Sequence, residues 1–389
     1  MQRFNRIFLI PIFLFTTLIC GLPSGTLSAQ QPLLQSDSSF FPAPTGPYTV
    51  GRTSRHWVDE SREEAFTDAA DDLRELIIRI WYPAEPEAGA EPGAYMADFA
   101  GELGQDAIGA WLAFIAQDPI VPWFSEHIGG WVSHAFPDAA VSDGQATYPV
   151  LIFSPGLHSF PEQYTTQIEE LASHGYIVVG INHPYTSGVT VFPDERIVAT
   201  LNFRLTSIAV IEQILTTQAE DIVFVLDSLE TLNADDPEGA FTRRLNLEQV
   251  GVFGHSMGGG AAVIAGARDA RIQAILAEDG ALLPPGRFGQ DQIAAPLMSF
   301  TSADTGYGTA GPYYRVTVDG FAHMSFADDP VWPLPPEVAF SNGERIVAIV
   351  RAYTLAFFDK HLKGEEVILL DGASDDFPEV TIEASNNEQ

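Results

Sequence analysis

The sequence predicts an α/β fold, with a mostly parallel central sheet and helices on both of its faces. Short runs rich in β-branched residues alternate along the chain with longer segments whose apolar residues recur at helical spacing. Strands that alternate with helices are joined by right-handed crossovers, which makes neighbouring strands parallel. With 46% hydrophobic residues in a chain of 389, there is enough apolar side chain to bury the core of such a sheet.

The first half of the chain contains a strand, a loop, a second strand and a helix. Residues 73–83 (LRELIIRIWYP) alternate and are β-branched, which predicts a strand. The alternating Ala, Glu, Gly and Pro of residues 85–93 predict the loop after it. Residues 148–156 (YPVLIFSPG) predict a buried strand that ends in a Pro-Gly turn. The next helix has Pro161 in its first turn and Gly175 at its end, where these residue types are favoured.

The second half alternates more regularly. We expect strands at residues 176–182, 248–253, 271–278, 295–300 and 313–318, and helices at about 204–232, 257–267 and 341–364. In the last helix the apolar residues Ile346, Val350, Tyr353 and Phe357 lie on one face, and Gly364 ends it. Each strand is followed by a helix or a loop at its carboxyl end, and in a parallel sheet these ends meet at one edge, where function gathers.

Three segments depart from this alternation. Residues 94–141 separate two core strands and hold three of the six tryptophans, which predicts an aromatic-rich insertion of helices and loops over the sheet. The Pro- and Ser-rich residues 30–47 predict a linker or an extended arm. Residues 365–389 predict an acidic C-terminal tail. One domain is therefore expected to span residues 48–364.

The N-terminal residues 1–29 have the three parts of a secretory signal peptide. Two arginines precede an apolar run from Ile7 to Ile19, and small residues lead to Ala29, where cleavage is expected. The run is shorter than the roughly 20 residues of a membrane-spanning helix, so a secreted or periplasmic protein without a stable anchor is predicted. An uncleaved anchor and lipidation at Cys20 are the alternatives. Cleavage removes the single cysteine, which excludes disulfides, thiolate metal sites and a cysteine nucleophile.

The charge balance is strongly acidic. The formal net charge is −33, and Lys360 and Lys363 are the two lysines of the whole chain. Binding to nucleic acids or to anionic membrane surfaces requires basic patches, so this composition argues against both.

The stretch EQVGVFGHSMGGGAAV, residues 248–263, has the context of a nucleophile elbow. Gly254, Ser256 and Gly258 form the pattern G-x-S-x-G directly after a predicted strand and before a predicted helix. In such a turn the serine is held in a strained conformation that lifts its hydroxyl from the backbone, so the two flanking positions must lack side chains. The start of the helix also directs free N–H groups toward the same point. Ser256 is therefore the candidate nucleophile of an α/β-hydrolase fold.

A serine nucleophile needs a base to take its proton and an acid to orient that base. In α/β-hydrolases the chain order is Ser, then the acid, then His. Two histidines follow Ser256: His361 lies near the end of the last helix, whereas His323 lies in the loop after a predicted strand and is the candidate base. Asp279 and Asp304 end two successive predicted strands, and the pattern alone does not choose between them as the acid.

Five blocks of sequence point to a family. In chain order they are FSPGLHSF, ELASHGYIVVGINHP, GVFGHSMGGGAA, ILAEDGALLP and DGFAHMSFAD. Together they resemble the plasma-type platelet-activating-factor acetylhydrolases and their bacterial relatives, a family of serine-dependent α/β-hydrolases. With further likeness upstream and in YTLAFFDKHLKG, the resemblance covers most of residues 48–364. One departure is Pro155, where the family commonly has His.

The resemblance implies a catalytic set and a substrate class. It assigns the acid to Asp279, because the family's acid is the Asp followed by a short apolar run after the first strand beyond the elbow. An oxyanion hole needs two backbone N–H groups: one follows the nucleophile, at Met257, and the family match with the Pro-Gly turn indicates Leu157 for the other. The implied substrates are phospholipids with short or oxidised sn-2 acyl chains, and the aromatic insertion is then an acyl-binding lid, a lipid-contacting surface or a packed cap.

Other assignments stay open. His158 and His183 lie near the predicted site, as substrate contacts or as structural hydrogen-bond partners, and His255 is expected to pack beside the elbow. We find no phosphate-binding glycine signature and no spaced His and Asp set for a metal, so no cofactor is expected. A general carboxylesterase or a polyester hydrolase fits the same residues. A secreted binding protein without turnover is the alternative from another class.

Overall fold

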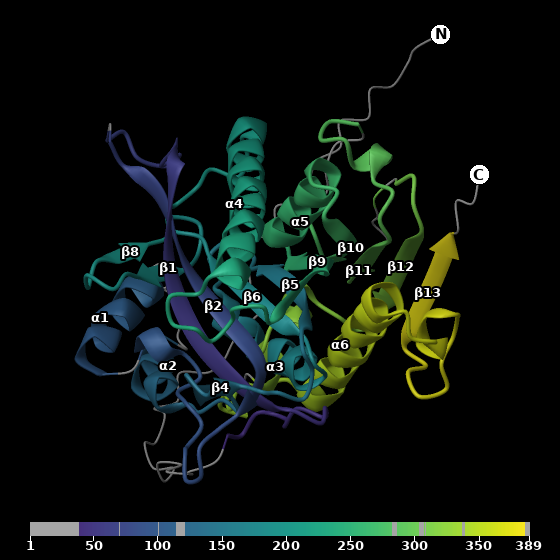
Figure 1. The fold of residues 1–389 in the computed structure, drawn as a ribbon, viewed down its shortest axis with the longest axis horizontal. Helices are drawn as coiled ribbons and strands as arrows, with labels where there is room; N and C mark the ends of the chain where they lie inside the picture. The colour runs from purple at the N-terminus through teal and green to yellow at the C-terminus, as the bar shows by residue number, and fades with distance from the viewer. Residues whose placement is uncertain are drawn as a thin grey trace, which may run out of the picture.

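The structure, a computed structural model, describes residues 39–69, 71–99, 101–113, 121–281, 286–302, 307, 309–336 and 339–385 (Figure 1). The predicted signal peptide lies outside the described residues, as does Asp304, one of the two candidate acids. None of the described helices is both long enough and apolar enough to cross a membrane.

A large mixed sheet forms the centre of the described chain. Its strands are β1 (Thr49–Glu63), β2 (Leu73–Glu85), β3 (Phe136–Pro137), β4 (Ala140–Val141), β5 (Tyr148–Ser154), β6 (Ile177–Asn182), β9 (Leu245–His255), β10 (Ile272–Glu278), β11 (Leu297–Thr301), β12 (Tyr313–Val318) and β13 (Val380–Ser385). They are ordered β13-β12-β11-β10-β9-β5-β6-β2-β1-β3, and β4 pairs with β2. From β12 to β6 every pair is parallel, whereas β13, β2 and β1 are antiparallel to their inner neighbours. A separate hairpin joins β7 (Val189–Val191) to β8 (Ile197–Ala199).

Helices cover both faces of the sheet (Figure 1). The helices are α1 (Gly101–Leu112), α2 (Val121–His127), α3 (Thr165–Ser173), α4 (Ile208–Ala234), α5 (Met257–Arg268) and α6 (Gly343–Phe358). Shorter helical turns span Ala97–Phe99, Ile128–Gly130, Pro161–Tyr164, Gln290–Gln292, His323–Phe326, Asp329–Val331, Asp359–Lys363 and Ile368–Leu370. Helices α4 and α5 pack on one face, α3 and α6 on the other. The predicted α/β architecture is confirmed.

The alternation of side chains in the central strands explains the two cores. In β5, Val150 and Ile152 join the cluster under α4 and α5, whereas Leu151 and Phe153 join the cluster under α3 and α6. All four are fully buried. A strand with apolar residues on both faces is stable only when both faces are covered, so its continuous apolar run specifies a central position in the sheet.

Both ends of the domain differ from the predicted boundaries. The extended arm packs on the domain: Phe41 is 3% exposed, and the Arg351 guanidinium donates hydrogen bonds to the carbonyl oxygens of Pro42 and Ala43. At the other end the domain does not stop at residue 364, because β13 pairs with β12 and extends the sheet. The sequence VTIEAS of β13 alternates, but it is short and lies among acidic residues. For this reason the sequence predicts an acidic tail at this point and not an edge strand.

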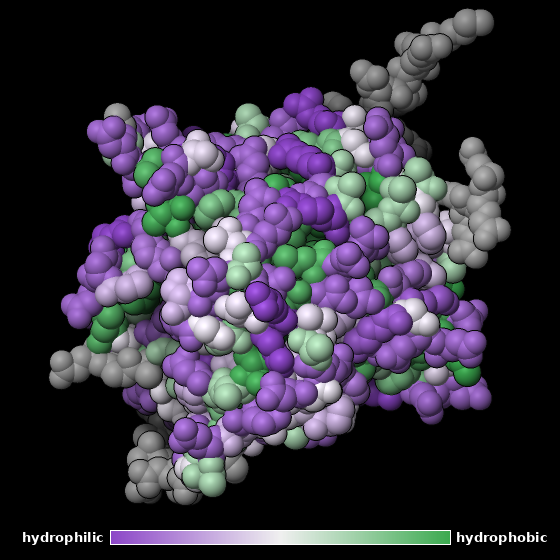
Figure 2. All heavy atoms as spheres, in the orientation of Figure 1, coloured by the Kyte–Doolittle hydropathy of each residue, from purple (hydrophilic) through white to green (hydrophobic). Residues whose placement is uncertain are grey.

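The insertion at residues 94–141 contributes α1, α2 and a third hydrophobic cluster. Trp111, Phe124 and Trp131 are buried there together with Phe41 of the arm and Trp332 of a later loop. The described residues of the insertion therefore form a packed cluster with the arm, with Phe160 after β5 and with this later loop. On the face drawn in Figure 2, hydrophilic residues cover most of the surface, as the acidic composition requires.

Candidate active site

Ser256 lies in a sharp turn between β9 and α5. Its backbone has φ 54° and ψ −118°, a combination that residues with a side chain rarely adopt. The glycines allow the turn to close on β5: a Cβ on Gly254 would lie 2.5 Å from the carbonyl oxygen of Ser154, and one on Gly258 would lie 2.0 Å from it. A hydrogen bond of 2.9 Å from the Ser256 N–H to the Glu278 carbonyl holds the turn on its other side.

Asp279 and His323 meet at the same edge of the sheet. Asp279 directly follows β10, and His323 begins the helical turn after β12. His323 Nδ1 lies 2.6 Å from Asp279 Oδ2. The other carboxylate oxygen, Oδ1, accepts hydrogen bonds of 2.9 Å from Thr301 Oγ1, from the Ser302 N–H and from Ser302 Oγ. These donors fix the carboxylate in the plane that faces the imidazole.

The hydrogen bond between Asp279 and His323 decides which imidazole nitrogen is free. Burial raises the pKa of the Asp279 carboxyl, but hydrogen bonds from His323 and Ser302 outweigh burial and hold it below its ordinary range. Because an ionised carboxylate can only accept, Nδ1 carries the proton and Nε2 is left as the base. Within the described residues Ser256 Oγ and His323 Nε2 do not form a hydrogen bond, and such bonds often tighten only when substrate binds.

His255, the residue before Ser256, holds the loop that carries His323. Its ring is buried, and its Nε2 lies 2.8 Å from the His323 carbonyl oxygen while its Nδ1 lies 2.8 Å from the Tyr164 hydroxyl. A carbonyl only accepts, so Nε2 donates to it and Tyr164 donates to Nδ1. Burial, followed by the nearby charge of His323, lowers the pKa of His255 to about 3, so the ring is neutral. The sequence predicted packing here but not these two distant partners.

Two backbone N–H groups lie beside the nucleophile. A Cβ on Gly156 would lie 3.3 Å from the Ser256 Cβ, which places the next residue, Leu157, at the edge of the site. Met257 begins α5, where the helix dipole favours negative charge. Within the described part of the chain, neither the Leu157 N–H nor the Met257 N–H has a hydrogen-bond acceptor. Unpaired donors in this position can stabilise an oxyanion.

The two other predicted histidines differ in exposure. His183 is fully buried, with Nε2 3.0 Å from Ser154 Oγ and Nδ1 2.7 Å from Asp221 Oδ2. The substrate-contact alternative for His183 is therefore corrected, because both ring nitrogens are engaged inside the protein. His158 is half-buried, and its Nδ1 lies 2.6 Å from Thr200 Oγ1. Substrate contact through His158 stays a prediction.

The aromatic insertion contacts the site from the side of Leu157. A Cβ on Gly188 would lie 2.6 Å from the His158 carbonyl oxygen and 2.7 Å from Trp111 Cδ1, so the α1 tryptophan packs close to the loop after β5. The ring centroids of Trp111 and Phe160 are 5.2 Å apart. These contacts bury the aromatic rings as structural packing around the site.

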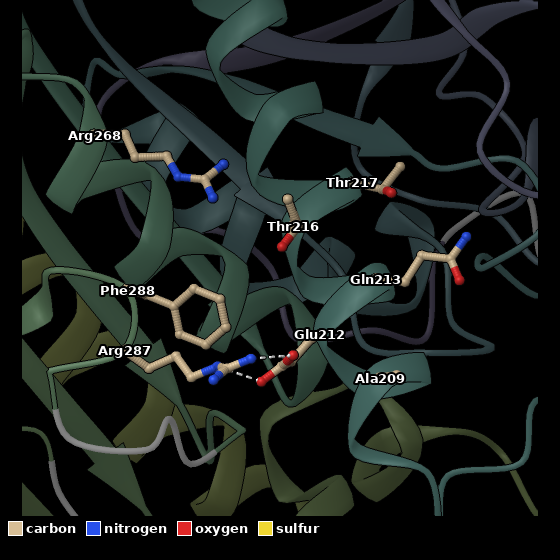
Figure 3. Close-up of a pocket in the computed structure, with 8 residues that line it drawn as sticks. All are labelled: Ala209, Glu212, Gln213, Thr216, Thr217, Arg268, Arg287 and Phe288. Carbon is tan, nitrogen blue, oxygen red and sulfur yellow. Dashed lines mark hydrogen bonds and ion pairs between the residues drawn. The ribbon is translucent and has the colours of Figure 1, made fainter.

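A hollow of about 650 Å³ lies elsewhere, between α4, the end of α5 and the loop at Phe288 (Figure 3). Its Arg287 guanidinium pairs with Glu212 at 2.5 Å, and none of the candidate catalytic residues lines it. Among the described residues, no group of three or more His, Cys, Asp or Glu side chains could hold a metal ion.

Comparison with known proteins shows which family the chain belongs to. The family model described as platelet-activating factor acetylhydrolase, isoform II, matches residues 33–307, which is more than half of the chain. The chain belongs to this acetylhydrolase family. The resemblance found in the sequence is thereby confirmed. The matched range includes Ser256 and Asp279 but ends before His323, which is placed at the site by the structure.

Two relatives of this acetylhydrolase family member share about a quarter of the aligned residues with it. A probable 1-alkyl-2-acetylglycerophosphocholine esterase of Arthroderma benhamiae is 25% identical over 275 residues, which is 68% of this chain and 64% of that protein. The platelet-activating factor acetylhydrolase of Gallus gallus is 22% identical over 295 residues, 61% of this chain and 68% of that protein. The chain thus spans about two thirds of the length of these relatives.

A solved structure confirms the α/β-hydrolase fold. The ferulic acid esterase from Streptomyces cinnamoneus superimposes with a TM-score of 0.67 at 26% identity, covering 87% of this chain and 98% of that one. The shared fold therefore extends over nearly all of the esterase and most of this chain.

The protein also buries a carboxyl group, that of Glu278, directly before Asp279 in the sequence. Glu278 is fully buried, its Oε2 accepts a hydrogen bond of 3.3 Å from Gln167 Nε2, and its Oε1 has no partner among the described residues. Gln167 also donates to the carbonyl of Phe326 in the turn that begins at His323. Burial raises the pKa of Glu278 to about 8, because within the described part of the chain no cation pairs with its carboxylate.

We expect this carboxyl to make stability pH-dependent. In the unfolded chain a glutamate ionises near its ordinary pKa of 4.5, whereas folded Glu278 stays protonated up to about pH 8. The folded state therefore binds more protons over this window, and stability falls as the pH rises through it. The Glu278→Gln variant should show a smaller loss of Tm between pH 5 and pH 8.5 than the wild type, measured by thermal unfolding. The exposed Glu248→Gln is the control, and an equal pH dependence in all three proteins would contradict the prediction.

Proposed function

We propose that this protein is a secreted carboxylic ester hydrolase that releases short acyl chains from phospholipids through an acyl-serine intermediate. The observation that carries the proposal is the pairing of Asp279 with His323 at 2.6 Å, at the same sheet edge as a serine in a strained strand-to-helix turn. Membership of the acetylhydrolase family supports the ester chemistry, and the names of both curated relatives support an acetylated glycerophospholipid as substrate.

The proposed reaction begins with Ser256. Nε2 of His323 takes the hydroxyl proton as Oγ forms a bond to the ester carbonyl carbon, and Asp279 stabilises the imidazolium. The N–H groups of Leu157 and Met257 donate to the oxyanion of the tetrahedral intermediate. Its collapse breaks the bond to the alcohol oxygen, which receives the proton from Nε2. Water then loses a proton to Nε2 and attacks the acyl-serine, which releases the carboxylic acid and returns the proton to Ser256.

A second candidate function comes from the structural neighbour. The match covers 98% of the ferulic acid esterase, so a carboxylesterase of small or aromatic acyl esters would use the same residues on the same scaffold. The two candidates differ only in what surrounds the acyl and alcohol groups. Substrate rates are therefore the measurement that separates them.

We expect the mature protein to hydrolyse acetyl esters best. Rates should be measured on nitrophenyl acetate, butyrate and octanoate, on methyl ferulate, and on a glycerophosphocholine with an sn-2 acetyl group. Because a short-chain pocket discriminates by about tenfold or more per misplaced methylene, octanoate should have a kcat/KM at least about tenfold below acetate. Turnover of the phospholipid supports the proposal. Turnover of methyl ferulate and simple esters without the phospholipid would reject it in favour of the second candidate.

A further inference from the structure

A second set of hydrogen-bonded Ser, His and Asp side chains lies in the core near the candidate site: Ser154, His183 and Asp221. Ser154 Oγ is 3.0 Å from His183 Nε2, and His183 Nδ1 is 2.7 Å from Asp221 Oδ2. All three residues are 0% exposed, so neither water nor an ester reaches the Ser154 hydroxyl. Ser154 is the last residue of β5 and directly precedes the oxyanion loop, residues 155–158.

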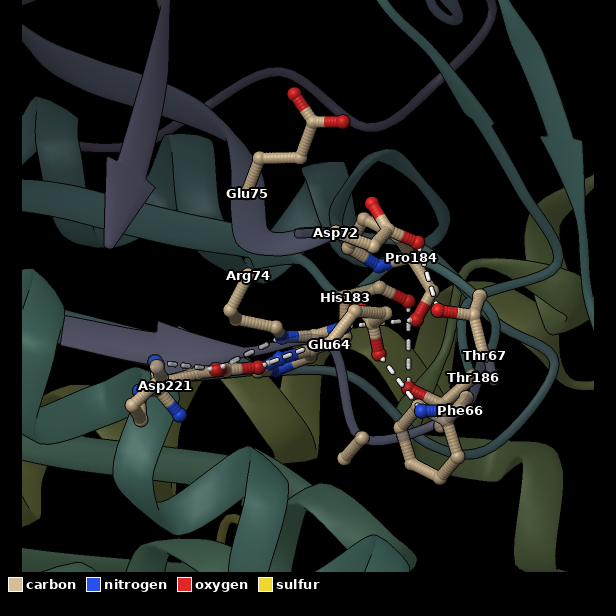
Figure 4. A network of polar contacts seen from close by, with 12 residues as sticks. Glu64, Phe66, Thr67, Asp72, Arg74, Glu75, His183, Pro184, Thr186 and Asp221 are labelled. Atoms are coloured by element: carbon tan, nitrogen blue, oxygen red, sulfur yellow. Dashed lines mark hydrogen bonds and ion pairs between the residues drawn. The ribbon is translucent and has the colours of Figure 1, made fainter. Parts of the chain in front are cut away.

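The charge of Asp221 sets the direction of the hydrogen bonds among these three residues. Figure 4 draws Asp221 with its partners Arg74 and His183. Arg74 donates to both carboxylate oxygens at 2.6 and 3.1 Å, and Arg62 donates to Oδ1 at 2.9 Å. Burial raises the pKa of Asp221, but the charge of Arg74 and the hydrogen bond from His183 outweigh it and keep the carboxyl ionised. The carboxylate accepts, so His183 Nδ1 carries the proton. Burial lowers the pKa of His183, the ring is neutral, and Ser154 must donate to Nε2.

The turn that begins at His183, residues 183–187, also holds the C-terminal end of the oxyanion loop, at His158. The His158 N–H donates to the Thr186 carbonyl at 2.8 Å, and the N–H groups of Thr186 and Ser187 donate to the His183 carbonyl at 3.1 and 2.7 Å. Arg74 also donates to the Pro184 carbonyl at 3.3 Å. Two anchors, one on each side of Leu157, therefore belong to one turn that begins at His183.

We propose that Ser154, His183 and Asp221 are positioning residues, which hold the Leu157 N–H where the oxyanion forms. A loop anchored on one side only could rotate the Leu157 peptide away from the nucleophile. The buried hydrogen bond at Ser154 supplies the anchor on the β5 side and is rigid because every donor and acceptor along it has a single orientation. This inference rests on the proposed function, since it assigns Leu157 to the oxyanion hole.

The Ser154→Ala variant tests the proposal. It removes the hydroxyl that donates to His183 and leaves Ser256, Asp279 and His323 unchanged. Since loss of one oxyanion donor typically costs about 10²–10³ in kcat, a displaced donor should lower kcat on nitrophenyl acetate by about 10- to 100-fold, with KM nearly unchanged. The affinity for an alkyl trifluoromethyl ketone, whose adduct with Ser256 carries the oxyanion, should fall by the same factor.

A matched control separates positioning from general stability. Ser173→Ala makes the same change at a fully buried serine of α3, whose hydroxyl donates to the Glu170 carbonyl at 2.7 Å and has no link to the loop. We expect its kcat to equal that of the wild type. A second variant, Ser154→Cys, keeps a weaker donor, so its kcat should lie below that of the wild type and above that of a folded Ser154→Ala. If the alanine variant unfolds, the kcat and the ketone affinity of Ser154→Cys alone test the proposal, and both should fall together.

The outcomes distinguish this inference from the proposed function. Wild-type protein without ester turnover that depends on Ser256 would reject the proposed function. Normal wild-type turnover with an unaffected Ser154→Ala variant, or a loss of kcat without loss of ketone affinity, would overturn the positioning role. Labelling of Ser154 by a fluorophosphonate in the Ser256→Ala variant would also overturn it, because Ser154 would then be a second nucleophile.

Discussion

Replacing Ser256 with alanine is expected to lower kcat on nitrophenyl acetate by about 10⁶-fold, the loss seen when the nucleophile of a serine triad is removed. Among the described residues, Ser256 lies in a strained turn at the same sheet edge as His323, the proposed base, so we expect no other described hydroxyl to replace its oxygen. The measurement is turnover of purified mature protein over a long incubation, together with covalent labelling by a fluorophosphonate probe. The probe should label wild-type protein at Ser256 and leave the variant unlabelled.

The control for this experiment is Ser228→Ala. Ser228 is a half-buried serine of α4 whose hydroxyl donates to the Phe224 carbonyl at 2.9 Å, so the change removes the same hydroxyl group at a position away from the site. Turnover and labelling should match the wild type. Folded wild-type protein that resists the probe at Ser256 would contradict the enzyme assignment and favour a binding protein on the same scaffold.

Much of the fold could be predicted because its signals are local. The run of β5 and the apolar spacing of α6 each lie within one element, and the glycines around Ser256 report a close approach to β5 that any residue with a Cβ would prevent. The candidate base could be chosen from chain order, since His323 is the one histidine after Ser256 in a suitable loop, and the structure brings it into contact with Asp279.

The features that could not be predicted depend on distant partners. His183 follows a strand at the functional edge, which made substrate contact a fair expectation, but Asp221 lies 38 residues away on α4 and draws the ring into the core. His255 is similarly defined by Tyr164, 91 residues earlier in the chain. Such pairings depend on how α3 and α4 pack on the sheet, and no local pattern encodes them.

The choice between the two candidate acids could be made from family resemblance but not from the local sequence pattern. In the sequence, Asp279 and Asp304 end two successive predicted strands, so periodicity treats them alike, and resemblance was needed to separate them. The structure adds a physical reason: the end of β11, which leads toward Asp304, contributes the Thr301 hydroxyl and the Ser302 N–H as donors to Asp279. That strand end therefore holds the carboxylate that follows β10 and contacts His323, which supports Asp279 as the proposed acid.

We therefore expect Asp279→Asn to lower kcat by about 10⁴-fold, because an amide in this place forces the wrong imidazole tautomer. Thr301 Oγ1, the Ser302 N–H and Ser302 Oγ all donate toward the position of Oδ1, so the amide oxygen must occupy it. The amide nitrogen then faces His323 Nδ1 and donates to it. The proton of the neutral imidazole moves to Nε2, which can no longer accept the proton of Ser256.

The paired variant Asp304→Asn, on the same ester, decides between the two carboxylates. We expect its kcat to stay within a few-fold of the wild type, while Tm values of both variants show that each is folded. Because an asparagine side chain has nearly the same volume as the aspartate that it replaces, a loss of turnover in Asp279→Asn reports the tautomer and not a collapsed site. Collapse of turnover in Asp304→Asn alone would assign the acid to Asp304 and leave the contact of Asp279 with His323 without a catalytic role.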